Sequence, residues 1–256
     1  MEGLIHIKHY HFTIIIILGV CLSNEVKAQT VDHFSGWSAV FSTTRLNSKF
    51  SLHLEAQVRS NNEWKEVQTV ILRTGLNYNI KPGQIITVGY AYIAHHRTRD
   101  SVRGWGPEQR IWEQFILNKA FSINDHLITI QNRFRLEQRW ISRSTVKDDQ
   151  LVTDGYIFSQ RIRYFARAIY PFSPTSQKVF SKGSYFSLQD ELFFNLGNTS
   201  DVNGKFFDQN RAYTSIGYRF SSKYDLEIGY MNQIVSGRDN LKTINNILQF
   251  AAYLRL

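Results

Sequence analysis

The sequence predicts an all-β protein, folded as a single closed antiparallel β-barrel of about ten to twelve strands. Two observations carry this prediction. After residue 30 the chain is a succession of long segments in which apolar and polar residues alternate, the period of a strand, with no helical pattern between them. Aromatic residues make up 14% of the 256 residues and only 4 are Pro, a composition that favours strands.

Eleven segments show this alternation, and each ends at a turn signal. The segment 49–59, KFSLHLEAQVR, is typical, because Leu52, Leu54 and Val58 share one face while Glu55 and Arg59 share the other. The predicted strands are 36–46, 49–59, 70–80, 84–96, 108–122, 126–142, 155–171, 185–196, 209–220, 224–235 and 243–256.

The connections between these segments alternate in length. Short links are expected at 47–48, 81–83, 123–126 and 221–223, and longer loops at 60–66, 97–107, 143–154, 197–207 and 236–242. Short turns at one end and long loops at the other are typical of a transmembrane barrel. The link at 172–183 should be short by this rule and is not.

The stretch QNRFRLEQRW, residues 131–140, shows the question of facing most clearly. Arg133, Arg135, Glu137 and Arg139 lie on one face, and Phe134 with other large residues on the opposite one. A soluble barrel or sandwich would bury the apolar face, whereas a membrane barrel turns it towards lipid. The segments run to 11–17 residues, which is longer than soluble strands usually are and long enough to cross lipid, so we expect charges inside.

Strand number is less well determined. Bacterial single-chain barrels normally have an even number of strands. Either segment 36–46 lies outside the barrel, giving ten, or one more strand exists near the N-terminus, giving twelve, which we favour. Both even counts place the two termini at the short-turn end.

The N-terminal residues 1–28 are predicted to be a signal peptide. An apolar run, FTIIIILGVCL, follows Lys8, and Val26-Lys27-Ala28 forms a small-residue cleavage site. Cleavage leaves residues 29–256 as one barrel domain and removes Cys21, which is the single cysteine of the chain. We therefore expect export to the outer membrane of a Gram-negative bacterium.

Charged residues on the predicted inner face form the candidate functional site. Arginine exceeds glutamate there, which would attract small anions, although the same charges could simply pair and fill a narrow lumen. Glu55, Arg59 and Arg73 belong to this face. The main predicted lumenal residues are Arg133, Arg135, Glu137, Arg139, Arg161, Arg163, Arg167, Glu113, Glu191, Arg211, Arg219 and Glu227.

Two further groups of residues are predicted at the barrel rims. A basic patch on the outer loops would comprise Arg97, Arg99 and Arg103, and its simpler interpretation is a solvated loop. Aromatic girdles, which mark membrane interfaces, are predicted near both strand ends. The girdle residues are Trp140, Tyr156 and Phe158 towards the long loops, and Tyr170, Phe220 and Tyr224 towards the short turns.

Several of these segments resemble a known family. PEQRIWEQF (107–115), FRLEQRW (134–140), QRIRYFARAIYP (160–171), LQDELFFNLG (188–197), FFDQNRAYTSIGYRF (206–220) and LEIGYMNQ (226–233) are similar to bacterial outer-membrane barrels catalogued as domain-of-unknown-function family 2490 and common in Bacteroidetes. The resemblance covers roughly residues 34–256. It implies a barrel fold and an outer-membrane location, and it implies no activity or substrate.

The functional expectation is a structural or porin-like barrel that passes or binds small anions through an arginine-lined lumen. The alternatives are a lipid hydrolase built into the barrel and a soluble exported β-protein. We expect no enzymatic activity, because no spacing of Ser and His selects a catalytic triad. No cofactor, metal or nucleic acid is expected, and the expected partner is outer-membrane lipid around a monomer.

Overall fold

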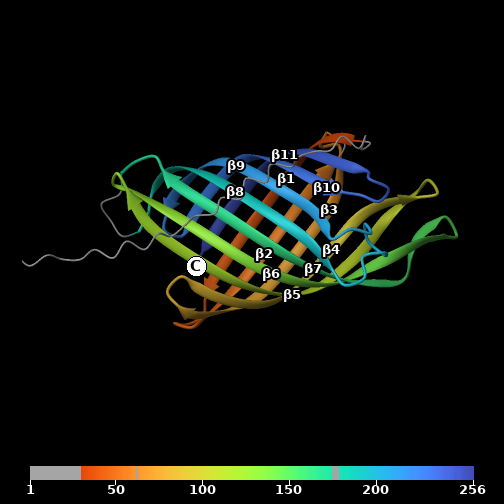
Figure 1. Cartoon of the computed structure of the whole chain (residues 1–256), viewed down its shortest axis with the longest axis horizontal. Coiled ribbons are helices and arrows are strands. Elements are labelled where there is room, and N and C mark those ends of the chain that lie inside the picture. The colour runs from red at the N-terminus through yellow and green to blue at the C-terminus, as the bar shows by residue number, and fades with distance from the viewer. Residues whose placement is uncertain (1–29, 62, 175–178) are drawn as a thin grey trace, which may run out of the picture.

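The strands of this protein close into one barrel (Figure 1). The computed structural model describes residues 30–61, 63–174 and 179–256, so the predicted signal peptide and Cys21 lie outside the described residues. The strands are β1 (Thr30–Arg45), β2 (Phe50–Asn61), β3 (Glu66–Lys81), β4 (Gln84–Arg99), β5 (Val102–Ile123), β6 (His126–Lys147), β7 (Gln150–Pro171), β8 (Gly183–Leu196), β9 (Phe207–Ser221), β10 (Tyr224–Ser236) and β11 (Lys242–Arg255). No helix among the described residues is long and apolar enough to cross a membrane.

Each strand pairs antiparallel with its neighbour in sequence, and β1 closes the barrel by pairing parallel with β11. The all-β barrel fold is therefore confirmed, with eleven strands in the described part of the chain, inside the expected range but short of the favoured twelve. An odd count forces this parallel seam, because the first and last strands of an up-and-down barrel then run in the same direction. The seam extends from Thr30 beside Lys242 to Thr43 beside Arg255.

The odd strand number also corrects the predicted position of the termini. β1 runs from the long-connection end to the short turn at 46–49, so Thr30 lies at the end opposite Leu256. Backbone hydrogen bonds join the other ends of the two strands: Arg45 N donates to Leu256 O at 2.6 Å, and Leu256 N donates to Thr43 O at 2.8 Å. Both even counts would have placed the termini together.

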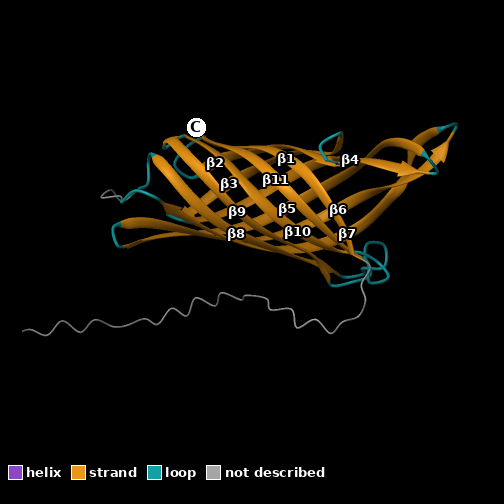
Figure 2. Cartoon of the chain, turned by 90° about the horizontal axis from the view of Figure 1, so that it is seen from above, coloured by secondary structure: helices purple, strands orange, loops and turns teal. Residues whose placement is uncertain are grey.

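Two predicted loops are in fact largely strand. β4 and β5 continue to a two-residue turn at Asp100-Ser101, and β6 and β7 to another at Asp148-Asp149. All four turn residues have positive φ, between 49° and 65°, the geometry of a tight hairpin turn. Both hairpins project beyond the barrel wall (Figure 2). The two hairpins contact each other below their tips, since Arg97 Nη1 on β4 donates to Ser142 O on β6 at 2.6 Å.

The link at 172–183, which broke the predicted rule of short turns, has a structural role. Phe180 is buried with Leu127 and Tyr185 at the short-turn end of the barrel. Arg219 holds it there, because Nη1 donates to Phe180 O at 2.6 Å and the guanidinium carbon lies 4.7 Å from the ring centroid. The described part of the link therefore places the Phe180 ring inside the lumen at this end.

Candidate functional site

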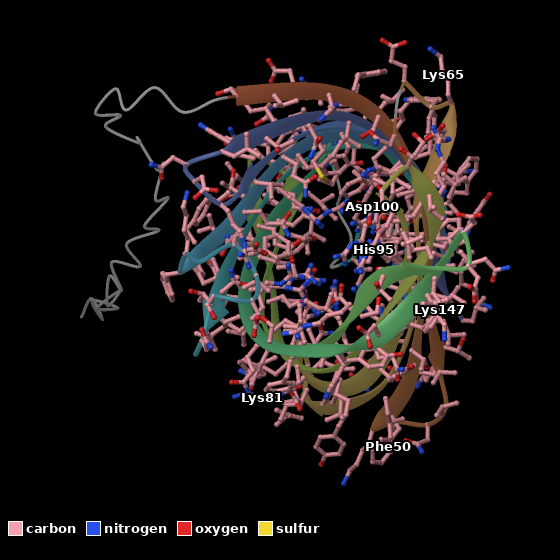
Figure 3. The ribbon with its side chains drawn as sticks, turned by 90° about the vertical axis from the view of Figure 1, so that its right-hand side faces the viewer. Phe50, Lys65, Lys81, His95, Asp100 and Lys147 are labelled. Carbon is pink, nitrogen blue, oxygen red and sulfur yellow. The ribbon has the colours of Figure 1, made fainter. Side chains whose placement is uncertain are left out.

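The barrel is charged inside and apolar outside. Glu137 is fully buried and Arg135 is 2% exposed, whereas Phe134, which precedes Arg135 in the sequence, is 46% exposed. In the view along the barrel, His95 lies inside the ring of strands among nitrogen-rich side chains, and Phe50 lies on the outside (Figure 3). The alternation read from residues 131–140 therefore has the predicted facing.

Eleven of the twelve main predicted lumenal residues point inwards in the structure. Eight of them line the central cavity, Glu137 and Glu227 are buried behind its wall, and Arg219 has a side chain that is 13% exposed. The eleven are Arg133, Arg135, Glu137, Arg139, Arg161, Arg163, Arg167, Glu191, Arg211, Arg219 and Glu227.

Glu113 is the exception, and its predicted lumenal position is wrong. It pairs with Leu136 across the strands and accepts a hydrogen bond from Gln138 Nε2 at 3.2 Å on the outer face. Trp112 takes the inward position instead and is completely buried. Room for its ring exists because Gly75 and Gly89 face it: a Cβ on either would lie within 3.0 Å of the Trp112 ring.

Because Trp112 faces inwards, the neighbouring alternate residues of β5 also face the lumen, and the sequence analysis missed them. Glu108 and Arg110 lie on the inward face beside Trp112, and their side chains form an ion pair at 2.6 Å. The pairing of two glycines opposite a tryptophan was the available signal. Asp208 was also missed, because a register shift beside β8 breaks the alternation there and lets it contact Arg161 at 2.7 Å.

A continuous ion-pair network occupies one side of the lumen. Glu137 contacts Arg161 at 2.7 Å, Arg163 at 2.6 Å and Arg110 at 3.5 Å. Arg163 also contacts Glu191 at 2.7 Å, which extends the network to β8. Charges buried to this degree are tolerated because each is compensated by several partners. This part of the predicted site is paired filling, as the simpler interpretation expected.

A second group of contacts lies nearer the short-turn end. Glu227 pairs with Arg167 and accepts hydrogen bonds from the hydroxyls of Tyr185 and Tyr213, each at 3.0 Å. Asp225 pairs with two further arginines, Arg219 at 2.9 Å and Arg255 at 2.6 Å. Together with Phe180, these contacts fill the lumen beside β8, β9 and β10 at this end, while the cavity reaches the same end beside β1 to β6.

A cavity of about 830 Å³ nevertheless remains inside the barrel, and arginine dominates its wall. Twelve arginines line it, against three carboxylates, Glu55, Glu191 and Asp225. Three other buried carboxylates, Glu108, Glu137 and Glu227, do not line it. The arginines thus outnumber the carboxylates that face the open space, which makes the cavity electropositive.

Four of the lining arginines have no carboxylate within ion-pair distance among the described residues. They are Arg45, which is exposed, and Arg59, Arg135 and Arg211, which are not. Neutral amides are their polar partners: Arg59 Nη2 donates to Gln57 at 2.7 Å, and Arg135 Nη2 to Gln114 at 2.7 Å. Arg135 Nη1 is buried without any hydrogen-bond partner.

The predicted outer-loop basic patch is not one surface. Arg97 points to the inner side, over Gly106, and is bonded to Ser142. Arg99 and Arg103 are exposed, but Arg99 donates to the Ser144 carbonyl and Arg103 pairs with Glu66 at 2.9 Å. The three side chains are therefore engaged in separate contacts that hold the hairpins and the neighbouring strand.

The predicted aromatic residues all lie on the outer surface, at the two ends expected. Trp140 packs on Phe158 with ring centroids 5.3 Å apart near the long connections. Phe220 packs on Tyr224 at 5.1 Å near the short turns. Tyr156 and Tyr170, also at opposite ends, are 47% and 39% exposed.

The closed sheet, the apolar outer wall, the aromatic ends and the charged lumen together define the class: this is a β-barrel protein. Within that class, the chain belongs to the family of proteins of unknown function DUF2490, whose model matches residues 34–245. It is also similar to an uncharacterized protein of Methylorubrum extorquens, with 26% identity over 202 residues, or 78% of each chain. The resemblance noted in the sequence is thus confirmed at the level of the family.

Proposed function

We propose that this protein is an outer-membrane β-barrel that admits small anions to an arginine-lined lumen. The observation that carries the proposal is the cavity wall, with twelve arginines against three carboxylates. Arginine keeps its charge under all physiological conditions, so such a wall attracts anions and repels cations. The predicted export signal and the outer surface described next support the proposed location.

The outer surface supports a membrane location. Apolar side chains such as Leu72, Val88 and Ile216 are each more than half exposed, an arrangement that water disfavours and lipid accepts. Closure of the sheet pairs every strand on both sides, as lipid requires because it offers no hydrogen bonds. The proposed surroundings are therefore outer-membrane lipid around a monomer.

The experiment that tests the proposal is a planar-bilayer recording of the purified, refolded protein under a salt gradient. We expect current whose reversal potential has the sign of anion selectivity, and flotation of the protein with lipid vesicles. A folded barrel without current, or with cation selectivity, would contradict lumenal anion passage. A detergent-free soluble monomer would contradict the membrane location.

One observation favours a second candidate, a hydrolase. Thr69 Oγ1 lies 3.2 Å from His95 Nδ1, and His95 Nε2 lies 3.1 Å from Glu108, an order that resembles a hydroxyl–imidazole–carboxylate triad. Thr69 is only 5% exposed, however, and Glu108 is already paired with Arg110 and Arg139. A carboxylate so neutralised stabilises an imidazolium weakly, so the proposal assigns no reaction to these residues. Lipid hydrolysis that is lost in Thr69→Val would reverse this choice.

A further inference from the structure

We propose that Arg59 and Arg211 form one binding site for a phosphate or carboxylate group within the lumen. The inference deepens the proposed function, on which it rests for access of the ligand to the barrel interior. It names a single pair of side chains and a ligand chemistry, whereas the proposed function needs only the summed charge of the wall.

The two arginines converge on one aromatic ring. The Arg59 guanidinium carbon lies 3.8 Å from the centroid of the Trp37 ring, and that of Arg211 lies 5.0 Å from it. Arg59 reaches the ring from the adjacent strand β2, where it pairs directly with Trp37, while Arg211 comes from β9, across two other strands. Closure of the barrel is therefore what brings the two cations together.

Neither cation has a carboxylate within ion-pair distance in the part of the chain that the structure describes. Arg59 donates from Nε and Nη2 to one oxygen of Gln57, at 3.1 Å and 2.7 Å, and Arg211 Nη2 lies 3.5 Å from the Gln209 oxygen. A guanidinium carries five N–H donors, so each group retains donors beyond these contacts. Both side chains line the cavity, which places the unused donors beside open space.

Most other arginines of the cavity wall, by contrast, have carboxylate partners. Arg73 pairs with Glu55, and Arg163 pairs with both Glu137 and Glu191. Arg59 and Arg211 are half-buried like charges that share a ring, so they repel each other. A bound anion would offset this repulsion, so the pair favours a negatively charged ligand.

The donor geometry selects the class of anion. The planar fork of arginine matches the two oxygens of a carboxylate or phosphate, which can bridge two guanidinium groups at once. Contact with Trp37 holds the cations in place through cation–π attraction and limits their side-chain freedom. Chloride has no second oxygen with which to form such a bridge, so an oxyanion is favoured over it.

The test is a titration of the purified barrel in detergent with inorganic phosphate, at constant ionic strength made up with chloride. Binding is followed by calorimetry and by tryptophan fluorescence, with Trp37→Phe identifying the part of the signal that comes from this ring. We expect saturable binding that weakens by roughly tenfold or more in Arg59→Gln and in Arg211→Gln. The matched control is Arg45→Gln, which removes an arginine that also lines the cavity.

The outcomes separate the site from the proposed function. Loss of phosphate binding in Arg59→Gln and Arg211→Gln, with binding kept in Arg45→Gln, supports the site. Equal weakening in all three variants, or no saturation in the unmodified protein, overturns it, even if bilayer recordings still show anion selectivity. Saturable binding in a barrel without conductance would support the site and contradict only lumenal passage.

Discussion

Glu137 accepts two hydrogen bonds from Arg161 through a single oxygen, from Nη2 at 2.7 Å and from Nε at 3.1 Å. Its other oxygen accepts from Arg163 Nη1 at 2.6 Å. One fully buried carboxylate thus compensates arginines of β7, and Arg110 of β5 lies 3.5 Å away. The stability of the lumen should depend on this group more than on any outward-facing acid.

Glu137→Gln should therefore lower the free energy of unfolding by about 3–5 kcal/mol, because it leaves buried guanidinium groups without their counter-charge. The measurement is thermal unfolding followed by circular dichroism in detergent. Glu113→Gln is the matched control, since Glu113 faces outwards and we expect a change within about 0.5 kcal/mol. Equal effects of the two substitutions would contradict the assigned facing of these strands.

Replacing a lumenal arginine by glutamine should change the stability of the protein in one of two ways, depending on whether that arginine has a carboxylate partner. Arg73→Gln should destabilise the protein by about 3–5 kcal/mol, because Glu55 is 6% exposed and Arg73 is its arginine partner. Arg59→Gln should be nearly neutral or stabilising, because it leaves no carboxylate unpaired and removes repulsion with Arg211. Chemical denaturation of the two variants in parallel provides the comparison, and a larger loss in Arg59→Gln would contradict it.

Gly89→Ala should be destabilising by about 1–3 kcal/mol, the usual cost of overpacking. A Cβ at Gly89 would clash with the Thr74 carbonyl oxygen and with the Trp112 ring. The backbone atom cannot give way as a flexible side chain can. Gly155→Ala is unsuitable as a control because the φ of Gly155 is positive. The control we suggest is Ala91→Gly. Both variants are compared with the unmodified protein by melting temperature and by Trp112 fluorescence.

Phe180→Ala should increase single-channel conductance, because it removes a ring that occupies part of the short-turn end of the lumen. The anchoring hydrogen bond from Arg219 goes to the Phe180 backbone oxygen and survives the substitution. Phe172→Ala, at an exposed ring of the same link, should leave conductance unchanged. Unchanged conductance in both variants would show that Phe180 does not restrict the path.

Ile228→Arg should impair insertion into lipid vesicles, at a cost of about 2–4 kcal/mol near the middle of a bilayer. Ile228 is 46% exposed and is flanked across the strands by Ile216 and Phe250, so the new charge would have no acidic neighbour there. Asn240→Arg, in the turn before β11, serves as the control. Insertion of both variants with equal yield would argue against a lipid-facing outer wall.

Much of the fold was predictable because strand alternation is a local property. The row Arg133, Arg135 and Glu137 could be assigned to one face from spacing alone, and the same held for the aromatic positions at strand ends. Local pattern was insufficient in β5, where both faces carry large and polar residues. The side that Trp112 occupies depends on Gly75 and Gly89, which lie on other strands.

The sequence by itself determined the strand segments, the charged and apolar faces and the excess of arginine over acid, because these depend only on residue type and spacing. Tertiary structure decided the parallel seam of β1 and β11, and with it the opposite positions of Thr30 and Leu256. It also decided which arginines are paired. Arg59 and Arg211 are 152 residues apart in the chain and share Trp37 only because closure and stagger of the barrel bring their strands to the same height.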